Sequence, residues 1–267
     1  MKRSVFKRGG LDLSVAETGE GAAFVFQHGL CGAAGQPADV FPVDSGWRCL
    51  TLECRGHGQS QSGDPAKFSI SVFADDLAEL IEARNLAPVV IGGISMGAAI
   101  ALRLAAIRPQ LVRGLVLARP AWVAEAAPSN AKPNAEVGEL LRRHPPVEAR
   151  GIFERSETAA KLTRDAPDNL ASLRGFFARE PIAVTAELLA RISADGPGVT
   201  RAAIGGIRVP TLIIGHGRDM IHPVAMAKEL SGLIPRSRLA AIPPKADNLQ
   251  AYRAGFRSAL ATFLKGF

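Results

Sequence analysis

Short apolar runs alternate along the chain with segments of helical periodicity, and this alternation restricts the fold more than any other sequence feature. Such runs are typical of buried parallel strands, which are joined by helical crossovers. Strands are predicted at Leu11–Glu17, Ala23–Gln27, Arg48–Leu52, Pro88–Ile94, Val112–Ala118, Val209–Gly215 and Arg238–Ile242. Helices are predicted from apolar spacings of three or four at Ser69–Ala83, Met96–Ile107, Pro223–Leu233 and Leu249–Phe263. The pattern therefore predicts an α/β fold, with a mostly parallel sheet and helices on both of its faces.

The alternation stops between Trp122 and Thr200. This stretch contains no convincing strand, and prolines separate its short helical pieces. Its length, about 80 residues, is far beyond that of an ordinary structureless loop. We therefore expect a helical insertion between two strands of the main sheet.

The composition argues against several classes of protein. Hydrophobic residues make up 47% of the 267 residues, enough for a large core. The net charge is +7, but the basic residues are scattered and form no recognisable nucleic-acid-binding module. No apolar run approaches the roughly 20 residues of a membrane span, and the basic start leads into no signal core. We expect a cytoplasmic protein whose partner is neither a nucleic acid nor a membrane.

The cysteines and glycines give no sign of a bound cofactor. Cys31, Cys49 and Cys54 are odd in number and have no Cys-x-x-Cys spacing, which argues against a disulfide framework and a zinc site. Neither G-x-G-x-x-G nor a phosphate-loop pattern is present. We expect no metal and no cofactor.

A candidate nucleophile lies in Gly93-Ile94-Ser95-Met96-Gly97, directly after a predicted strand and before a predicted helix. In this G-x-S-x-G pattern a sharp turn lifts the serine hydroxyl out of the sheet, and the flanking small residues let the backbone pack closely. The helix N-terminus also favours a developing anion. The pattern predicts Ser95 as a nucleophile; the alternative interpretation is a tight structural turn.

Two further turns follow predicted strands. After His28-Gly29, the backbone N–H of Leu30 can pair with that of Met96 to bind the oxygen that becomes negative during acyl transfer. His28 is a candidate substrate-binding residue, although a structural histidine is the commoner case. Residues 54–60 hold His57 among glycines, and we interpret this segment mainly as a structural turn beside the site.

These motifs together resemble the α/β-hydrolase superfamily. The resemblance rests on His28-Gly29, Arg55–Ser60, Gly93–Gly97 and Gly215–Asp219, which occur in the family's order. It implies an eight-stranded, mostly parallel sheet with a helical cap inserted after the sixth strand. The expected domains are therefore an α/β-hydrolase core at 1–121 and 201–267, and a helical cap at 122–200.

The resemblance also implies a catalytic acid. Asp219 comes just after the strand Val209–Gly215, where the family places a carboxylate that orients the base. The alternative interpretation is an Asp that caps the helix opening at Pro223, and one residue can do both.

The family's histidine is missing from its usual place after the last strand. The matching zone, Lys245–Asp247, contains no histidine, and none follows His222. His222 lies three residues after Asp219 and is the best candidate for a displaced base, which must come within about 3 Å of the serine hydroxyl or reach it through a water. Other interpretations stay open: His28 or His57 as base, Asp247 acting through a water, or no general base.

Arg119 and Trp122 mark the junction between the sixth strand and the insertion. Arg119 is a candidate for binding an anionic part of the substrate, or equally for pairing with an acid that holds the cap. Trp122 is a candidate substrate-binding residue, although packing in the core or at a hinge is the commoner role.

The sequence favours a serine hydrolase that acts on an ester, a thioester or another small acyl substrate through an acyl-enzyme on Ser95. The alternatives are a non-catalytic ligand-binding protein that keeps the fold, and an acyltransferase. The missing late histidine supports the non-catalytic alternative, whereas the intact serine turn and Asp219 argue against it.

Overall fold

A computed structural model describes all residues, 1–267, and contains one eight-stranded sheet in the order β1-β2-β4-β3-β5-β6-β7-β8. The strands are β1 (Lys2–Arg8), β2 (Leu11–Gly19), β3 (Ala22–Gln27), β4 (Trp47–Leu52), β5 (Val89–Ile94), β6 (Val112–Ala118), β7 (Thr211–Gly215) and β8 (Ser237–Ala241). From β4 to β8 every neighbouring pair is parallel, whereas β2 pairs antiparallel with both β1 and β4. The predicted α/β fold with a mostly parallel sheet is confirmed.

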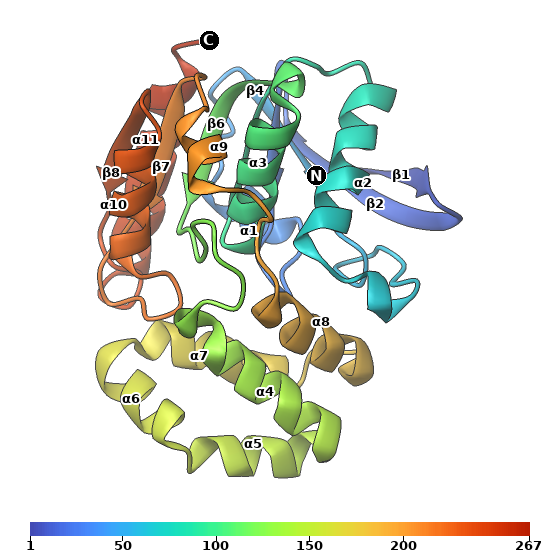
Figure 1. Cartoon of the computed structure of the whole chain (residues 1–267), viewed down its shortest axis with the longest axis vertical. Coiled ribbons are helices and arrows are strands. Elements are labelled where there is room, and N and C mark those ends of the chain that lie inside the picture. The colour runs from blue at the N-terminus through green and yellow to red at the C-terminus, as the bar shows by residue number, and fades with distance from the viewer.

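Helices cover both faces of the sheet (Figure 1). One face carries α2 (Ile70–Ala83), α3 (Met96–Ile107) and α10 (Val224–Leu233), and the other carries α1 (Gly35–Val40) and α11 (Leu249–Leu264). Alternate residues of a central strand serve the two faces, since Ile91 of β5 packs with the first group and Val90 with the second. Each large apolar side chain buried in this way contributes roughly 1.5–3 kcal/mol to stability.

Between β6 and β7 the chain forms a separate group of helices, which we call the helical layer. It consists of α4 (Lys132–Arg143), α5 (Pro146–Glu154), α6 (Glu157–Asp165), α7 (Pro167–Phe176) and α8 (Ile182–Ala194). No strand occurs between residues 122 and 200, and a short α9 (Arg201–Gly205) leads back to β7. Figure 1 shows the layer at one end of the sheet.

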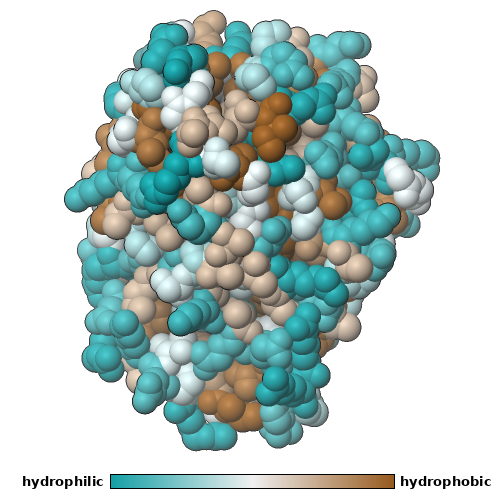
Figure 2. Space-filling view, in the orientation of Figure 1, coloured by the Kyte–Doolittle hydropathy of each residue, from teal (hydrophilic) through white to brown (hydrophobic).

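The helical layer has a hydrophobic core of its own. Phe153, Leu162 and Leu189 are fully buried in one cluster, which also includes Ile221 from the loop after β7. On the face seen in Figure 2, polar side chains cover much of the layer, with a small apolar patch at its lower end, and the buried apolar residues of its helices point inward. Ile221 connects this cluster to the loop that follows β7, whereas Leu188 and Ile192 of α8 pack into the core on the α2 and α3 face of the sheet.

No helix in the structure has both the length and the apolar character that a membrane crossing requires.

Candidate active site

Ser95 lies at the turn between β5 and α3 in a strained backbone conformation, with φ 57° and ψ −112°. Glycine is required on both sides of this turn. A Cβ at Gly93 would lie 2.2 Å from the backbone of Gly97, and one at Gly97 would lie 2.5 Å from the carbonyl oxygen of Gln27. Such strain persists only where the surroundings enforce it, and it is common at functional sites.

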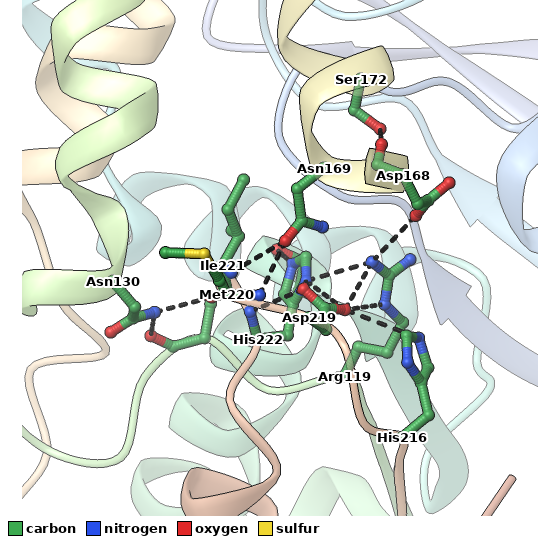
Figure 3. A network of polar contacts seen from close by, with 12 residues as sticks. Arg119, Asn130, Asp168, Asn169, Ser172, His216, Asp219, Met220, Ile221 and His222 are labelled. Carbon is green, nitrogen blue, oxygen red and sulfur yellow. Dashed lines mark hydrogen bonds and ion pairs between the residues drawn. The ribbon is translucent and has the colours of Figure 1, made fainter. Parts of the chain in front are cut away.

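The structure brings Ser95, His222 and Asp219 into one hydrogen-bonded line. The Nε2 atom of His222 is 2.8 Å from Ser95 Oγ. On the other side of the ring, Nδ1 is 2.9 Å and 3.0 Å from the two carboxylate oxygens of Asp219 (Figure 3). When Nδ1 carries the proton, its N–H donates a hydrogen bond to Asp219. Nε2 is then free to accept the proton of the Ser95 hydroxyl.

The loop after β7 is held in shape by hydrogen bonds at both ends. Asp219 Oδ1 accepts the backbone N–H of His222 at 3.0 Å, so this carboxylate both caps the turn and contacts the imidazole. The Oδ1 atom of Asn169, from α7, accepts the backbone N–H groups of Met220 and Ile221 (Figure 3). The helical layer therefore fixes the loop that carries His222.

Arg119 pairs with an acid. Its Nε and Nη2 atoms lie 2.9 Å and 2.7 Å from Asp219 Oδ2, and its Nη2 lies 3.8 Å from Asp168 of α7. Nη2 is also 3.2 Å from His222 Nδ1, a contact between two donors when Nδ1 is protonated. Arg119 thus joins the end of β6, the β7 loop and the helical layer.

Burial and this arginine set the charge states of the pair. Burial raises the pKa of Asp219, but His222 and Arg119 lower it more strongly, so that it lies well below its usual range. Burial lowers the pKa of His222, and Arg119 lowers it further, against the opposing effect of Asp219. The carboxylate is therefore charged and the imidazole neutral near pH 7, as a general base must be.

His216, at the end of β7, is a neighbour that the sequence analysis did not single out. Its Nε2 is 3.5 Å from Asp219 Oδ2 and has no hydrogen-bond partner, while its Nδ1 contacts the carbonyl oxygen of Gly217. The ring packs edge-on against Tyr252 of α11. His216 closes the side of Asp219 that faces away from His222 (Figure 3).

His28, His57 and Trp122 lie in the core instead of lining the site cavity. Nε2 of His28 accepts the backbone N–H of Cys54, and Nε2 of His57 accepts that of Cys31. Trp122 is 3% exposed and donates its indole N–H to a backbone oxygen near the end of α8. These contacts give all three residues a structural role.

Leu30 lines the same cavity as Ser95, and Met96 is the residue that follows Ser95. Met96 is the first residue of α3, so its N–H has no partner within the helix. The N–H of Leu30 donates to no acceptor in the protein. The loop before it is fixed by the Gln36 side chain, which accepts the N–H of Gly29 at 2.6 Å.

A cavity of about 100 Å³ opens above Ser95. Its walls come from the loops after β3, β5, β6 and β7 and from the helical layer. The lining residues are Gly29, Leu30, Gln36, Ile94, Ser95, Arg119, Asn134, Asn169, Ser172, Phe176, Ile221, His222 and Lys245. Asn134, Asn169 and Lys245 belong to no recognisable sequence motif, so the sequence alone does not predict them as cavity residues.

Lys245 occupies the zone where the family's histidine is expected. Its Nζ lies 2.6 Å from Asp168 Oδ1, at the edge of the cavity. Asp247, the other residue considered there, is exposed and forms an ion pair with Arg218. Neither side chain contacts Ser95 in the structure.

The chain matches the alpha/beta hydrolase fold family over residues 22–254 and belongs to that family. BpoC of Mycobacterium tuberculosis strain H37Rv, which is named as a non-heme bromoperoxidase, is 28% identical over 229 residues, 85% of this chain and 86% of that protein. RutD of Stutzerimonas stutzeri, which is named as a carbamate hydrolase, is 29% identical over 222 residues, 81% of each chain. The crystal structure of a bromoperoxidase from Bacillus anthracis is 20% identical, with a TM-score of 0.76 over 99% of this chain and 100% of that one. The relatives of this chain are thus enzymes of a hydrolase family.

Proposed function

We propose that this protein is a serine hydrolase that cleaves an ester, a thioester or another small acyl compound through an acyl-enzyme on Ser95. The single observation that carries the proposal is the line of hydrogen bonds from Ser95 Oγ through the His222 ring to Asp219. It joins a strained, glycine-flanked serine to a largely buried imidazole and a buried carboxylate. Such an arrangement activates a hydroxyl that is a weak nucleophile on its own.

In the first half of the reaction, His222 Nε2 takes the hydroxyl proton while Ser95 Oγ bonds to the carbonyl carbon. The N–H groups of Leu30 and Met96 stabilise the oxygen as it becomes negative. Asp219 stabilises the imidazolium, which then gives its proton to the departing alcohol or thiol.

In the second half, His222 takes a proton from water and the resulting hydroxide equivalent attacks the acyl-enzyme. Collapse of the second tetrahedral intermediate breaks the bond to Ser95 Oγ, which regains its proton from His222. The reaction uses only these side chains, two backbone N–H groups and water.

We also propose that residues 122–200 act as a cap on a core formed by 1–121 and 201–267. Two helices of this segment, α4 and α7, supply walls of the cavity above Ser95. Open parallel sheets bind ligands at the carboxyl ends of their strands, which is where β5, β6 and β7 place Ser95, Arg119 and the His222 loop.

One of the relatives supports chemistry at an acyl carbon. RutD of S. stutzeri is named as a carbamate hydrolase, and a carbamate presents a carbonyl to a nucleophile as an ester does. The carbamate is one of the small acyl compounds that this proposal includes.

The test combines a fluorophosphonate probe, peptide mapping and hydrolysis of p-nitrophenyl acetate. We expect rapid labelling at Ser95, steady turnover of the ester, and loss of both in Ser95→Ala, which deletes one hydroxyl and leaves the fold intact. Inertness of the folded protein to both reagents favours the non-catalytic alternative. A large rise in p-nitrophenol release on addition of an alcohol, with the alcohol's ester as product, favours an acyltransferase.

A further inference from the structure

Asn169 holds its side chain in one orientation while leaving its amide nitrogen unused. Its Oδ1 accepts the backbone N–H groups of Met220 and Ile221, at 2.8 Å and 3.2 Å. These two bonds fix which end of the amide is the oxygen. The residue is only 2% exposed, its Nδ2 has no acceptor in the protein, and it lines the cavity above Ser95. Nδ2 therefore presents free N–H groups at the cavity.

Asn134, on α4, provides a second unused amide in the same wall. It is 8% exposed and lines the cavity, and neither of its side-chain polar atoms has a partner in the protein. An apolar side chain of similar size would fill this position without any loss of hydrogen bonding. Ligand cavities hold a small number of polar groups that fix the orientation of the ligand, so the free amide nitrogen of Asn169 and the free amide of Asn134 at one small cavity point to a ligand that pairs with them.

The charged residues of the cavity already have partners. Lys245 is paired with Asp168, and Arg119 is paired with Asp219. A carboxylate on the substrate would have to compete with these acids for each cation. The amides, in contrast, bind a neutral oxygen at no such cost.

We propose that Asn134 and Asn169 form a neutral polar subsite for an ether, hydroxyl or carbonyl oxygen carried by the acyl group of the substrate. The substrate class is that of small oxygen-bearing acyl compounds, such as alkoxyacyl, hydroxyacyl or oxoacyl esters, and plain alkanoyl esters are poorer substrates. This inference rests on the proposed serine hydrolysis, because the subsite faces the cavity above Ser95.

Two esters of nearly equal size test the subsite. The p-nitrophenyl ester of methoxyacetic acid has an ether oxygen where that of butyric acid has a methylene group. Each kcat/KM is divided by the rate constant for hydroxide-catalysed hydrolysis of the same ester, which removes the difference in intrinsic reactivity. We expect the corrected ratio of methoxyacetate to butyrate to be about ten in the wild-type protein, the effect of a single well-placed hydrogen bond.

Asn134→Leu is the decisive variant because it keeps the size of the side chain and removes both polar atoms. We expect the corrected ratio to fall from about ten toward one, because the ether oxygen then keeps only the Asn169 amide as a partner. Ser172→Ala is the matched control, since Ser172 lines the same cavity but its hydroxyl donates to the backbone oxygen of Asp168. We expect the control to keep the wild-type ratio.

The outcomes separate the subsite from the reaction. A wild-type ratio near one, or an unchanged ratio in Asn134→Leu, overturns the subsite even while Ser95-dependent hydrolysis continues. Persistence of turnover in Ser95→Ala, or failure of the folded wild-type protein to hydrolyse either ester, overturns the proposed function and the subsite with it. Circular dichroism of each variant verifies that it is folded.

Discussion

His222 and Asp219 are three residues apart on one loop, so the proposed base and its orienting acid come from the same turn. In the family that the sequence resembles, these two residues follow different strands. Here Asp219 holds both the backbone N–H and the ring of His222. The relative position of acid and base is therefore set locally, while their approach to Ser95 depends on how the loop is held.

The first prediction concerns His222 itself. His222→Gln keeps a hydrogen-bonding side chain but cannot cycle a proton, so kcat should fall by about 10²–10⁴-fold. The measurement is steady-state hydrolysis of p-nitrophenyl acetate, with Lys245→Gln as a control at the family's usual histidine zone. A larger loss of kcat in Lys245→Gln than in His222→Gln would contradict the assignment of the base.

The second prediction concerns Arg119, which acts here as a positioning residue. Its charge lowers the pKa of His222, and kcat/KM is lost as pH falls through that pKa because the ring becomes protonated. Arg119→Gln should therefore move the acid limb of the kcat/KM profile to higher pH, by about one pH unit. Arg119→Lys keeps the charge and should move the limb less. An identical acid limb in all three proteins would show that the arginine has no electrostatic effect on the base.

At this scale the sequence predicts residues that belong to motifs and misses residues that do not. Ser95 is predictable because a sharp strand-to-helix turn demands small neighbours, and His222 because it is the last histidine and flanks Asp219. Asn134 and Asn169 are not predictable. An asparagine on a helix has many common roles, and only the packed structure shows that the amide nitrogens of these two residues have no partner in the protein and lie at a cavity.

At the scale of elements, the predicted strands and helices are found with ends that differ by a few residues, and two elements of the core, β1 and the short helix α1, have no counterpart among the predictions. β1 carries Lys2, Arg3, Lys7 and Arg8 and is mostly exposed, so it lacks the apolar run that marks the other strands. It is held by antiparallel pairing with β2 at the edge of the sheet. The pattern of apolar residues within one segment does not predict such pairing between strands. Within residues 122–200, the absence of strands was predictable, but the packing of the helices was not.

Arg179, between α7 and α8, links the helical layer to the loop that carries Leu30. Its guanidinium donates to the carbonyl oxygens of Cys31 and Gly56, at 3.0 Å and 2.8 Å, and to the hydroxyl of Thr185 at 2.8 Å. Cys31 is the residue after Leu30. The arginine therefore holds the backbone that presents one of the two proposed oxyanion donors.

The third prediction follows from these three hydrogen bonds of Arg179. Arg179→Met keeps a long side chain but removes all three donated bonds, so the Leu30 N–H loses its fixed position. Because that N–H contacts the oxygen most strongly in the transition state, kcat should fall roughly ten- to a hundredfold, with little change in KM. The measurement is the separate determination of kcat and KM on p-nitrophenyl acetate.

Two variants control this experiment. Arg174→Met removes an arginine from the outer side of α7, where it pairs with Glu154 only, and should leave both constants close to wild type. Arg179→Lys can still donate some of these hydrogen bonds and should recover part of kcat. A rise in KM at constant kcat in Arg179→Met would instead assign the residue to ground-state binding.

At the scale of the whole molecule, the protein holds several histidines out of water. His28 and His57 are fully buried and their rings pack 4.8 Å apart, and His216 and His222 are largely buried at the site. Burial is the main cause that lowers the pKa of all four rings, most strongly for His57. In the unfolded chain the same rings regain a pKa near 6.5 and bind protons more readily.

The last prediction is that acid destabilises the fold from about pH 6.5 downward. At pH values between 6.5 and the lowered pKa values of the folded state, the unfolded chain binds more protons than the folded chain. The free energy of unfolding therefore decreases as the pH falls through this range. Each such histidine contributes up to about 1.4 kcal/mol per pH unit to the slope of the free energy of unfolding. Urea titrations at pH 7.5, 6.5 and 5.5 measure this slope.

His57→Gln should reduce the slope of the free energy of unfolding against pH by about the contribution of one histidine. The amide oxygen of the glutamine can still accept the N–H of Cys31, but it takes up no proton. A free energy of unfolding that is constant from pH 7.5 to 5.5 would mean that the buried rings do not control the acid stability of the fold.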